Sequence, residues 1–273
     1  MGLVTHECCV TSVLPVDRAG PRGVHGMNVA AIRLDQVMSY QTASLKSPVR
    51  LDVWADIACP WCYLGHARLE AVLEEKAAAG EVVQVRHRPF ELNPGLPPEG
   101  VPMAGFLEDR FGSTDALRDA QARIAAMGRE LGLAYDFDSV GKAPNSRLAH
   151  HLLSTYDDDP RQGVAVTALY RAYFEQGLDV TDAETLVEAV SGATGEQPAD
   201  VRRRLASPTD AVDAAFALGR QLGVVAVPTF VADAGAVVDP EVGLSAAAVA
   251  VQGAQPREVL VQVLDEARRR ANA

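Results

Sequence analysis

Two cysteines three positions apart, Cys59 and Cys62, are the residues of this 273-residue chain best suited to chemistry. They enclose Pro60 and Trp61, and the pattern around them places the pair at the start of a helix, where they lie close enough to bridge. Free N–H groups and the helix dipole favour an anion there, as a reactive thiolate requires. We therefore expect Cys59 to be the attacking thiolate, exposed above the helix opening. Cys62, buried one turn on, is then the thiol that resolves a mixed disulfide.

A zinc site is the main alternative for cysteines at this spacing, and it needs a second pair of ligands. The other two cysteines, Cys8 and Cys9, are adjacent to each other some fifty residues upstream. Neighbouring cysteines can pair only in a strained ring, so we assign them no role. We expect no metal site and no bound cofactor, only a redox-active disulfide.

The elements around this motif form a β-α-β unit. Residues 49–55 alternate apolar and polar or aromatic side chains, as a strand does, and residues 82–88 form a second strand. Residues 59–79 between them carry apolar side chains at helical spacing. Such a unit makes two parallel strands with a right-handed crossover, and the cysteine motif opens the crossover helix.

The rest of the chain is helical before it returns to strands. A Pro- and Gly-containing run at 92–101 breaks regular structure, and helices are predicted at 114–131, 145–156, 161–176, 182–190 and 199–206. A helix at 209–222, strands at 227–231 and 247–251 and a helix at 256–270 follow.

This order of elements predicts an α/β protein: a thioredoxin fold with an inserted all-helical domain. The thioredoxin-like domain is expected to comprise residues 48–95 and 207–273, and the helical insertion residues 96–206. Residues 1–47 mix glycines and prolines with weak periodicity, so we expect a poorly ordered leader.

The dipeptide Val227–Pro228, at the start of a predicted strand, is the second candidate for a part of the site. A proline that leads into a central strand is normally unfavourable, and a cis peptide bond is one way to turn the preceding backbone groups outward. The peptide group of Val227 then pairs with an extended substrate beside Cys59. The alternative is an ordinary trans proline at a sheet edge.

With these segments the chain resembles the DsbA-like thioredoxin family, in particular its FrnE-like cytoplasmic branch. The resemblance spans about 49–271 and is carried by DIACPWCYLG at 56–65, RPFELNP at 88–94, NSRLAH at 145–150, VPTFV at 227–231 and GAQ at 253–255. It implies a thiol–disulfide oxidoreductase with Cys59 as nucleophile, Cys62 as resolving thiol and a cis-Pro228 loop at the substrate groove. The substrate-binding residues expected from the motif and the resemblance together are Pro60, Trp61, Asn145, His150, Val227 and Pro228.

Two other functions compete with disulfide exchange. Relatives with the same inserted helices include a glutathione-dependent isomerase and kappa-class glutathione transferases, which typically carry Ser in place of the first cysteine. The presence of both Cys59 and Cys62 favours redox chemistry on protein or small-thiol disulfides, with glutathione as a candidate co-substrate. A non-catalytic thioredoxin-like binding module is the third possibility, and the intact cysteine pair argues against it.

The net charge and the lack of long apolar runs exclude several classes of partner. Lys and Arg number 25 against 36 Asp and Glu, a net charge of −11 that repels nucleic acid and anionic lipid. No apolar run approaches the roughly 18–20 residues of a membrane helix, and residues 1–40 lack the apolar stretch of a secretory signal. We expect a cytoplasmic monomer or homodimer without nucleic-acid or membrane partners. Of the histidines, His66 is expected to be a solvated helix residue and His87 a structural strand residue.

Overall fold

The computed structural model describes residues 48–111, 114–234, 245 and 248–272. These residues belong to one compact unit, Lys46–Ala273. The leader predicted at 1–47, with Cys8 and Cys9, lies outside the described residues.

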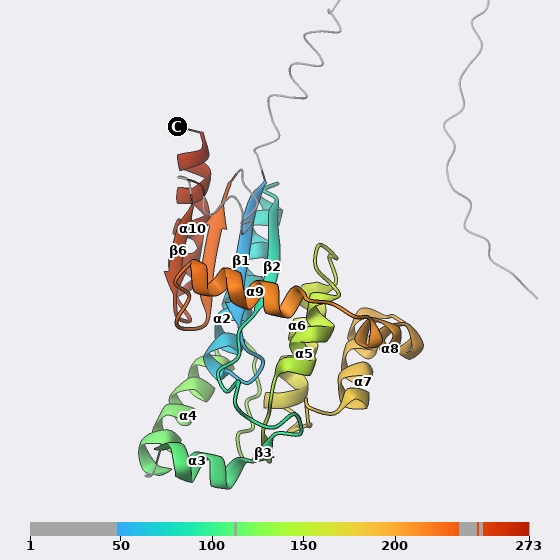
Figure 1. Ribbon diagram of the computed structural model, residues 1–273. Coiled ribbons are helices and arrows are strands. Elements are labelled where there is room, and N and C mark those ends of the chain that lie inside the picture. Colours follow the sequence, from blue (N-terminus) through green and yellow to red (C-terminus); the bar gives the residue numbers. More distant parts are fainter. Residues whose placement is uncertain (1–47, 112–113, 235–244, 246–247, 273) are drawn as a thin grey trace, which may run out of the picture. The chain divides into compact units, whose positions relative to one another are not determined.

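A four-stranded mixed sheet forms the centre of this unit (Figure 1). Its order is β2 (Val83–Pro89), β1 (Val49–Ala55), β5 (Thr229–Asp233) and β6 (Val249–Gln252). β1 runs parallel to β2 and antiparallel to β5, and β6 is antiparallel to β5. The predicted β-α-β unit is confirmed: α2 (Pro60–Ala78) connects the two parallel strands.

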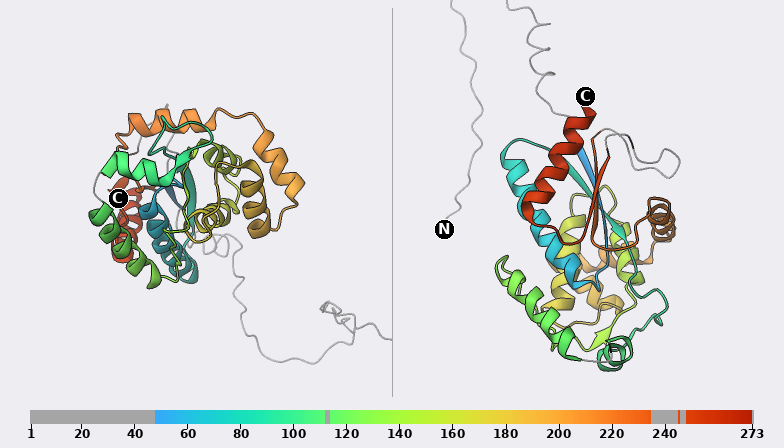
Figure 2. Two further views of the ribbon diagram at one scale, coloured as in Figure 1. Left: turned by 90° about the horizontal axis from the view of Figure 1, so that it is seen from below. Right: turned by 90° about the vertical axis from the view of Figure 1, so that its left-hand side faces the viewer.

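The two faces of the sheet are covered by different helices (Figures 1 and 2). Side chains alternate along a strand, so Leu51 and Val53 of β1 pack with α2 and α10 (Arg257–Ala271). Trp54 faces the other way and packs with Leu218 of α9 (Ala211–Gln221). Both faces of β1 are buried, and this strand leads directly into the loop that carries Cys59.

The segment between β2 and α9 is mostly helical, as predicted. It contains α3 (Met103–Phe111), α4 (Thr114–Arg129), α5 (Arg147–Ser154), α6 (Gln162–Phe174), α7 (Ala183–Thr194) and α8 (Pro198–Ala206). The sequence did not predict α3 or the short antiparallel pair β3 (Val101–Pro102) and β4 (Lys142–Ala143). Strands of two residues show no alternation that a sequence pattern can reveal. The boundaries at 95/96 and 206/207 stay a proposal.

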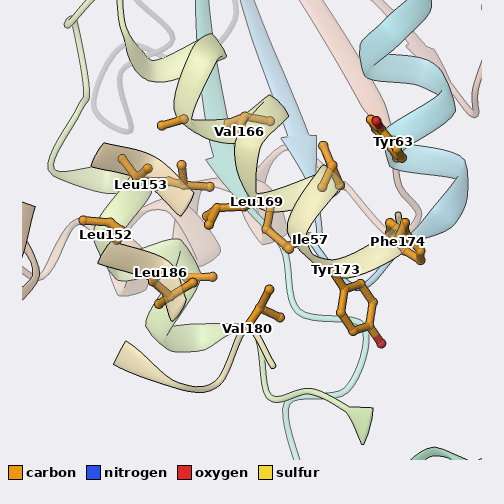
Figure 3. Close-up of a cluster of buried hydrophobic side chains, with 14 of the residues drawn as sticks. Ile57, Tyr63, Leu152, Leu153, Val166, Leu169, Tyr173, Phe174, Val180 and Leu186 are labelled. Atoms are coloured by element: carbon orange, nitrogen blue, oxygen red, sulfur yellow. The ribbon is translucent and has the colours of Figure 1, made fainter. Parts of the chain in front are cut away.

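A large apolar cluster joins the cysteine loop to the inserted helices (Figure 3). Ile57 of the loop and Tyr63 of α2 are each at most 2% exposed, and they share this cluster with buried residues of α5, α6 and α7. The loop therefore rests on the insertion as well as on the sheet.

Candidate active site

The cysteine motif occupies the first turn of α2, as the sequence predicts. Cys59 is the N-cap residue, in extended conformation, and Pro60 takes the first helical position, where no N–H partner is needed. The carbonyl oxygen of Cys59 accepts from the N–H groups of Cys62 (3.0 Å) and Tyr63 (3.2 Å). The Cys59 side chain thus stands at the positive end of the helix dipole.

Both cysteines are free thiols, and both are buried. Cys62 is 1% exposed, as expected, whereas Cys59 is only 5% exposed. The expectation that Cys59 is exposed above the helix opening is therefore wrong. Its side chain belongs to the apolar cluster against which Val227 and Ala254 also pack. Burial raises the pKa of the Cys62 thiol well above its usual value, and a hydrogen bond with Cys59 raises it further.

Asp56 holds the loop that leads to Cys59. Its carboxylate accepts from the backbone N–H of Ala58 (3.0 Å) and of Leu92 (2.6 Å), and its carbonyl oxygen accepts from Cys59 N–H (3.0 Å). Burial opposes the charge, but the hydrogen bond with His150, the charge of His150 and the two backbone donors outweigh it, so the pKa of Asp56 is lowered. The buried side chain is a carboxylate at neutral pH.

His150 reaches this loop from α5. Its Nε2 lies 2.9 Å from the carbonyl oxygen of Phe90 and 3.5 Å from Asp56 Oδ1, and the residue is 3% exposed. His150 thus contacts the dithiol loop from the buried side, through Asp56. Its predicted role in substrate binding stays a prediction.

The side chain of Asn145 makes hydrogen bonds within the insertion. Its Nδ2 donates to the carbonyl oxygen of Leu96 (2.7 Å), and its Oδ1 accepts from Arg147 N–H (3.0 Å). Asn145 therefore ties the segment after β2 to the start of α5. Its predicted contact with substrate stays a prediction.

The Val227–Pro228 peptide bond is cis, as the sequence analysis anticipated. Pro228 packs against α2 at Gly65, where an added Cβ would lie 3.0 Å from Pro228 Cγ. The carbonyl oxygen of Pro228 accepts from Gly253 N–H (2.7 Å). This loop is thus held between α2 and the end of β6.

Apolar side chains in the motif and in the segment before Pro228 are open to solvent. Trp61, inside the motif, is 40% exposed, and Val225, in the segment before Pro228, is 80% exposed. Val227 is partly buried. Exposed apolar side chains therefore lie on two separate segments, the motif itself and the segment that leads to Pro228.

Tyr135 is a site residue that the sequence did not reveal. Its hydroxyl donates to the carbonyl oxygen of Pro60 (2.7 Å), and its ring meets that of Tyr63 edge to face at 5.2 Å. It lies in the segment between α4 and β4, far along the chain from the motif, and no local pattern marks it. Only the fold brings Tyr135 to Pro60.

The expectation that His66 is solvated is also wrong. His66 is 3% exposed, and its Nε2 lies 2.7 Å from Thr167 Oγ1 of α6, since the inserted helices cover this face of α2. Its ring contacts that of His87, which is buried on β2 as expected. Burial lowers the pKa of His66 well below its usual value and that of His87 to about 4.

Two further observations concern ligands and membranes. Within the described part of the chain, no three His, Cys, Asp or Glu side chains are grouped so that they could hold a metal ion. None of the helices described there has the length and apolar character needed to cross a membrane.

The chain is similar to a known family of redox proteins over most of its length. Residues 50–265 match the DSBA-like thioredoxin domain. The chain belongs to this family. The predicted fold, a thioredoxin fold with inserted helices, is confirmed, and so is the enzyme class: this DSBA-like chain is a thiol–disulfide oxidoreductase.

Individual proteins are also similar to this chain. A probable DsbA oxidoreductase from Streptomyces coelicolor is 34% identical, with a TM-score of 0.67 over 80% of this chain and 89% of that one. A putative protein disulfide isomerase from Nitrosomonas europaea shares the fold at 17% identity, with a TM-score of 0.59 over 80% of this chain and 96% of that one. An uncharacterised protein of Bacillus subtilis is 25% identical over 191 residues, 67% of this chain and 86% of its own length.

Proposed function

We propose that this DSBA-like chain exchanges disulfides through Cys59 as the nucleophile and Cys62 as the resolving thiol. The observation that carries the proposal is the asymmetry of the pair. Cys59 is the N-cap residue at the positive end of the α2 dipole, while Cys62 lies one turn on, where burial raises the pKa of its thiol and keeps it protonated. One thiol is thus suited to attack first and the other to follow.

The exchange runs in two balanced steps. The Cys59 thiolate attacks one sulfur of a substrate disulfide, a bond forms between Cys59 and that sulfur, and the other substrate sulfur leaves as a thiolate. Cys62 then loses its proton and attacks Cys59, which releases the second substrate thiolate and leaves a Cys59–Cys62 disulfide. Two electrons pass from the enzyme to the substrate, and the reverse sequence oxidises a substrate dithiol.

Polypeptide disulfides are the substrates that the surroundings favour. Trp61 and Val225 expose apolar surface, and an extended chain beside Val227 can hydrogen-bond with its peptide group. The groove around Pro60, Trp61, Val227 and Pro228 is therefore assigned to substrate, with small thiols as the other candidates. The FrnE-type assignment, a cytoplasmic location and glutathione as co-substrate belong to the same proposal and rest on the sequence resemblance.

The glutathione-dependent isomerase or transferase is the alternative, and the site does not favour it. Such enzymes activate bound glutathione and do not cycle a disulfide of their own. A second thiol at Cys62, hydrogen-bonded to Cys59, is required only for a reaction in which the enzyme itself becomes oxidised.

Trapping of the mixed disulfide tests the proposal. Purified Cys62→Ser, incubated with a disulfide-containing protein, should accumulate a covalent adduct that thiols release, whereas Cys59→Ser should form none. A variant with both Cys8→Ser and Cys9→Ser is the matched control and should turn over like the parent protein. Adduct formation by Cys59→Ser, or turnover that survives in it, would contradict the assigned roles.

A further inference from the structure

The two edges of the central sheet differ. At the β2 edge, the side chain of Gln162 from α6 accepts from the backbone N–H of His87 (2.8 Å) and donates to its carbonyl oxygen (3.4 Å). The other edge is β6, which packs mainly against β5 and α10 in the part of the chain that the structure describes. In Figure 1, β6 is the outermost strand on the left, and the right view of Figure 2 turns that side to the viewer. An unpaired strand edge is a surface that a further strand can join.

The sequence of β6 lacks the features by which edge strands avoid pairing. Natural edge strands carry lysines, prolines or inward-pointing charges, whereas residues 248–252 read AVAVQ and contain neither a charge nor a proline. The side chains of Val249 and Val251 pack on the apolar cluster that includes Leu260 and Val263 of α10. This edge is therefore apolar and suited to pairing.

The ladder between β5 and β6 determines which backbone groups of β6 face outward. The hydrogen bond from Gly253 N–H to the Pro228 carbonyl oxygen (2.7 Å) marks a bonded pair at the end of this antiparallel ladder. Bonded pairs recur at every second residue, so Val251 bonds to β5 as well. The N–H and C=O groups of Ala250 and Gln252 therefore point away from the sheet.

Contacts within the chain occupy some of the outward groups. The Gln252 carbonyl accepts from Gln255 Nε2 (2.6 Å), and the Ala248 N–H donates to the Ser245 carbonyl oxygen (3.1 Å). The Ala248 carbonyl accepts from a side chain of α10 (3.2 Å) and keeps a second lone pair. Among the described residues, the groups left for another strand are the Ala250 N–H and C=O, the Gln252 N–H and that lone pair.

A second copy of β6 fits these remaining groups. In two β6 strands that pair antiparallel about a two-fold axis at Ala250, each Ala250 N–H donates to the partner's Ala250 carbonyl, and each Gln252 N–H to the partner's Ala248 carbonyl. The other bond of this register joins the Ala248 N–H to the partner's Gln252 carbonyl, and both of these groups are already satisfied within their own chain. A strand from another protein would bring a free C=O opposite the occupied Ala248 N–H and leave it unpaired.

Side chains beside the edge fit the same arrangement. A groove of about 490 Å³ runs between β6 and α10, and its lining includes Val249, Val259 and Val263. In the two-fold register, Val249 lies opposite the partner's Val251 on the α10 side of the sheet. Opposed β-branched side chains stabilise a ladder, so these valines would cover the groove from both chains.

The charges of α10 are complementary about the axis as well. α10 runs back along β6, since it starts just after the strand ends and Arg270 reaches the Ala248 carbonyl. The two-fold axis therefore sets the last turn of one α10 beside the first turn of the other. The last turn carries three arginines, while the first turn carries Glu258 and Arg257, which is paired with an acidic residue of α2 in its own chain. Opposite ends of two helix dipoles also attract.

We propose that this chain forms a homodimer through β6, in which the two strands pair antiparallel about Ala250 and join two four-stranded sheets into one continuous sheet. The occupant of the open edge is thus a second copy of the same chain. The interface uses neither Cys59 nor Cys62, so it stands apart from the proposed exchange reaction.

Sedimentation velocity at several protein concentrations tests the association. The parent chain should sediment as a dimer. Ala250→Lys should weaken association at least tenfold, because like charges would lie directly opposite each other at the axis, whereas the exposed side chain leaves the monomer intact. Ala214→Lys, at an exposed alanine of α9, is the matched control and should dimerise like the parent. A monomeric parent chain, or equal dimerisation by the two variants, would overturn the proposal.

Engineered cysteines test the register, in a background with Ser at the four native cysteine positions. The two Ala250 residues form a hydrogen-bonded pair, whose Cα separation of about 5.5 Å a disulfide can span. Ala250→Cys should therefore link two chains when copper phenanthroline oxidises it. Gln252→Cys should not, because its two copies lie four residues apart along the paired strands.

This background has no dithiol, so the crosslink tests the interface whether or not the proposed exchange is right. A crosslink at Ala250→Cys alone is the expected result. Failure of Ala250→Cys to crosslink, or equally rapid crosslinking by Gln252→Cys, would contradict pairing about Ala250.

Discussion

His150 Nε2 lies 3.5 Å from Asp56 Oδ1, and the same carboxylate oxygen accepts a hydrogen bond from the backbone N–H of Ala58, the residue before Cys59. His150 belongs to inserted helix α5, and Asp56 to the loop after the first strand of the sheet. One buried carboxylate therefore connects the insertion to the nucleophile loop. Changes on α5 should reach the dithiol through this contact.

Asp56→Asn should lower the free energy of unfolding by about 2–3 kcal/mol, because an amide group would face the Leu92 N–H where a carboxylate oxygen now accepts. Urea denaturation measures the loss. Asp158→Asn is the control, since this exposed residue pairs with Arg86 at the surface and should cost less than about 1 kcal/mol. Equal losses in the two variants would show that the Asp56 contacts contribute little.

The charge of Asp56 also predicts a pH dependence. Its pKa is lowered in the folded protein, so its contribution is fully present above the unfolded value of 3.8 and is lost as the pH falls below it. Unfolding free energies of the parent protein and Asp56→Asn should therefore converge toward low pH. A difference that stays constant below pH 3.8 would contradict this.

His87 predicts a loss of stability in a different pH range. Its pKa is about 4 when folded and 6.5 when unfolded, so between these values the unfolded chain binds more protons. The contribution of His87 to stability should fall by about 1.4 kcal/mol per pH unit as the pH drops from 6.5 toward 4, about 3 kcal/mol in all, and buried His66, whose pKa is also lowered, adds to the loss in the parent protein. Urea titrations of the parent protein and His87→Asn at several pH values measure the slope, which should be smaller in the variant. Identical slopes would show that His87 does not cause it.

Gly65→Ala should slow disulfide exchange several-fold. A Cβ at this position would lie 3.0 Å from Pro228 and 3.4 Å from Phe230, so the cis-Pro228 loop, which the proposal places at the substrate groove, must shift. Stopped-flow kinetics with a small disulfide reports the effect. Gly105→Ala on α3, where an added Cβ meets nothing within 4 Å, should react at the parental rate. Unchanged kinetics in Gly65→Ala would mean that the loop tolerates the added methyl group.

Tyr135→Phe should cost about 1 kcal/mol of stability and speed the alkylation of Cys59. It removes the hydrogen bond to the Pro60 carbonyl, which helps to fix the turn between the two cysteines. Tyr173→Phe is the matched control, because that hydroxyl donates to the Lys142 carbonyl instead. Alkylation with iodoacetamide, followed by mass spectrometry, compares the rates. Equal rates in both variants would contradict a role for Tyr135 at the motif.

Local patterns were sufficient to predict the parts of the site that lie close together in the sequence. Cys59 and Cys62 with Pro60 between them define the helix start, and the alternation at 49–55 defines the strand that leads to it. The proline before β5 marked the Val227–Pro228 peptide bond as a candidate for the cis form, and it is cis.

Contacts between distant segments could not be predicted in this way. The pattern of α2 alone predicts that His66 is solvated, whereas α6, a hundred residues later, covers it with Thr167. Cys59 was expected to be exposed because helix N-termini usually are, but the surrounding apolar cluster covers it. Tyr135 and the Asp56–His150 contact depend on where the insertion folds back onto the cysteine loop, which no local periodicity encodes.

An equilibrium titration in glutathione buffers of graded potential shows directly whether Cys59 and Cys62 form a redox pair. Trp54 and Trp61 fluorescence and a count of free thiols would follow the redox state, with Cys59→Ser as the control. We expect a reversible two-electron transition that is absent in the variant, with a midpoint that tells whether the enzyme mainly reduces or oxidises its substrates. A parent protein without such a transition, or one that persists in Cys59→Ser, would contradict Cys59 and Cys62 as the redox pair.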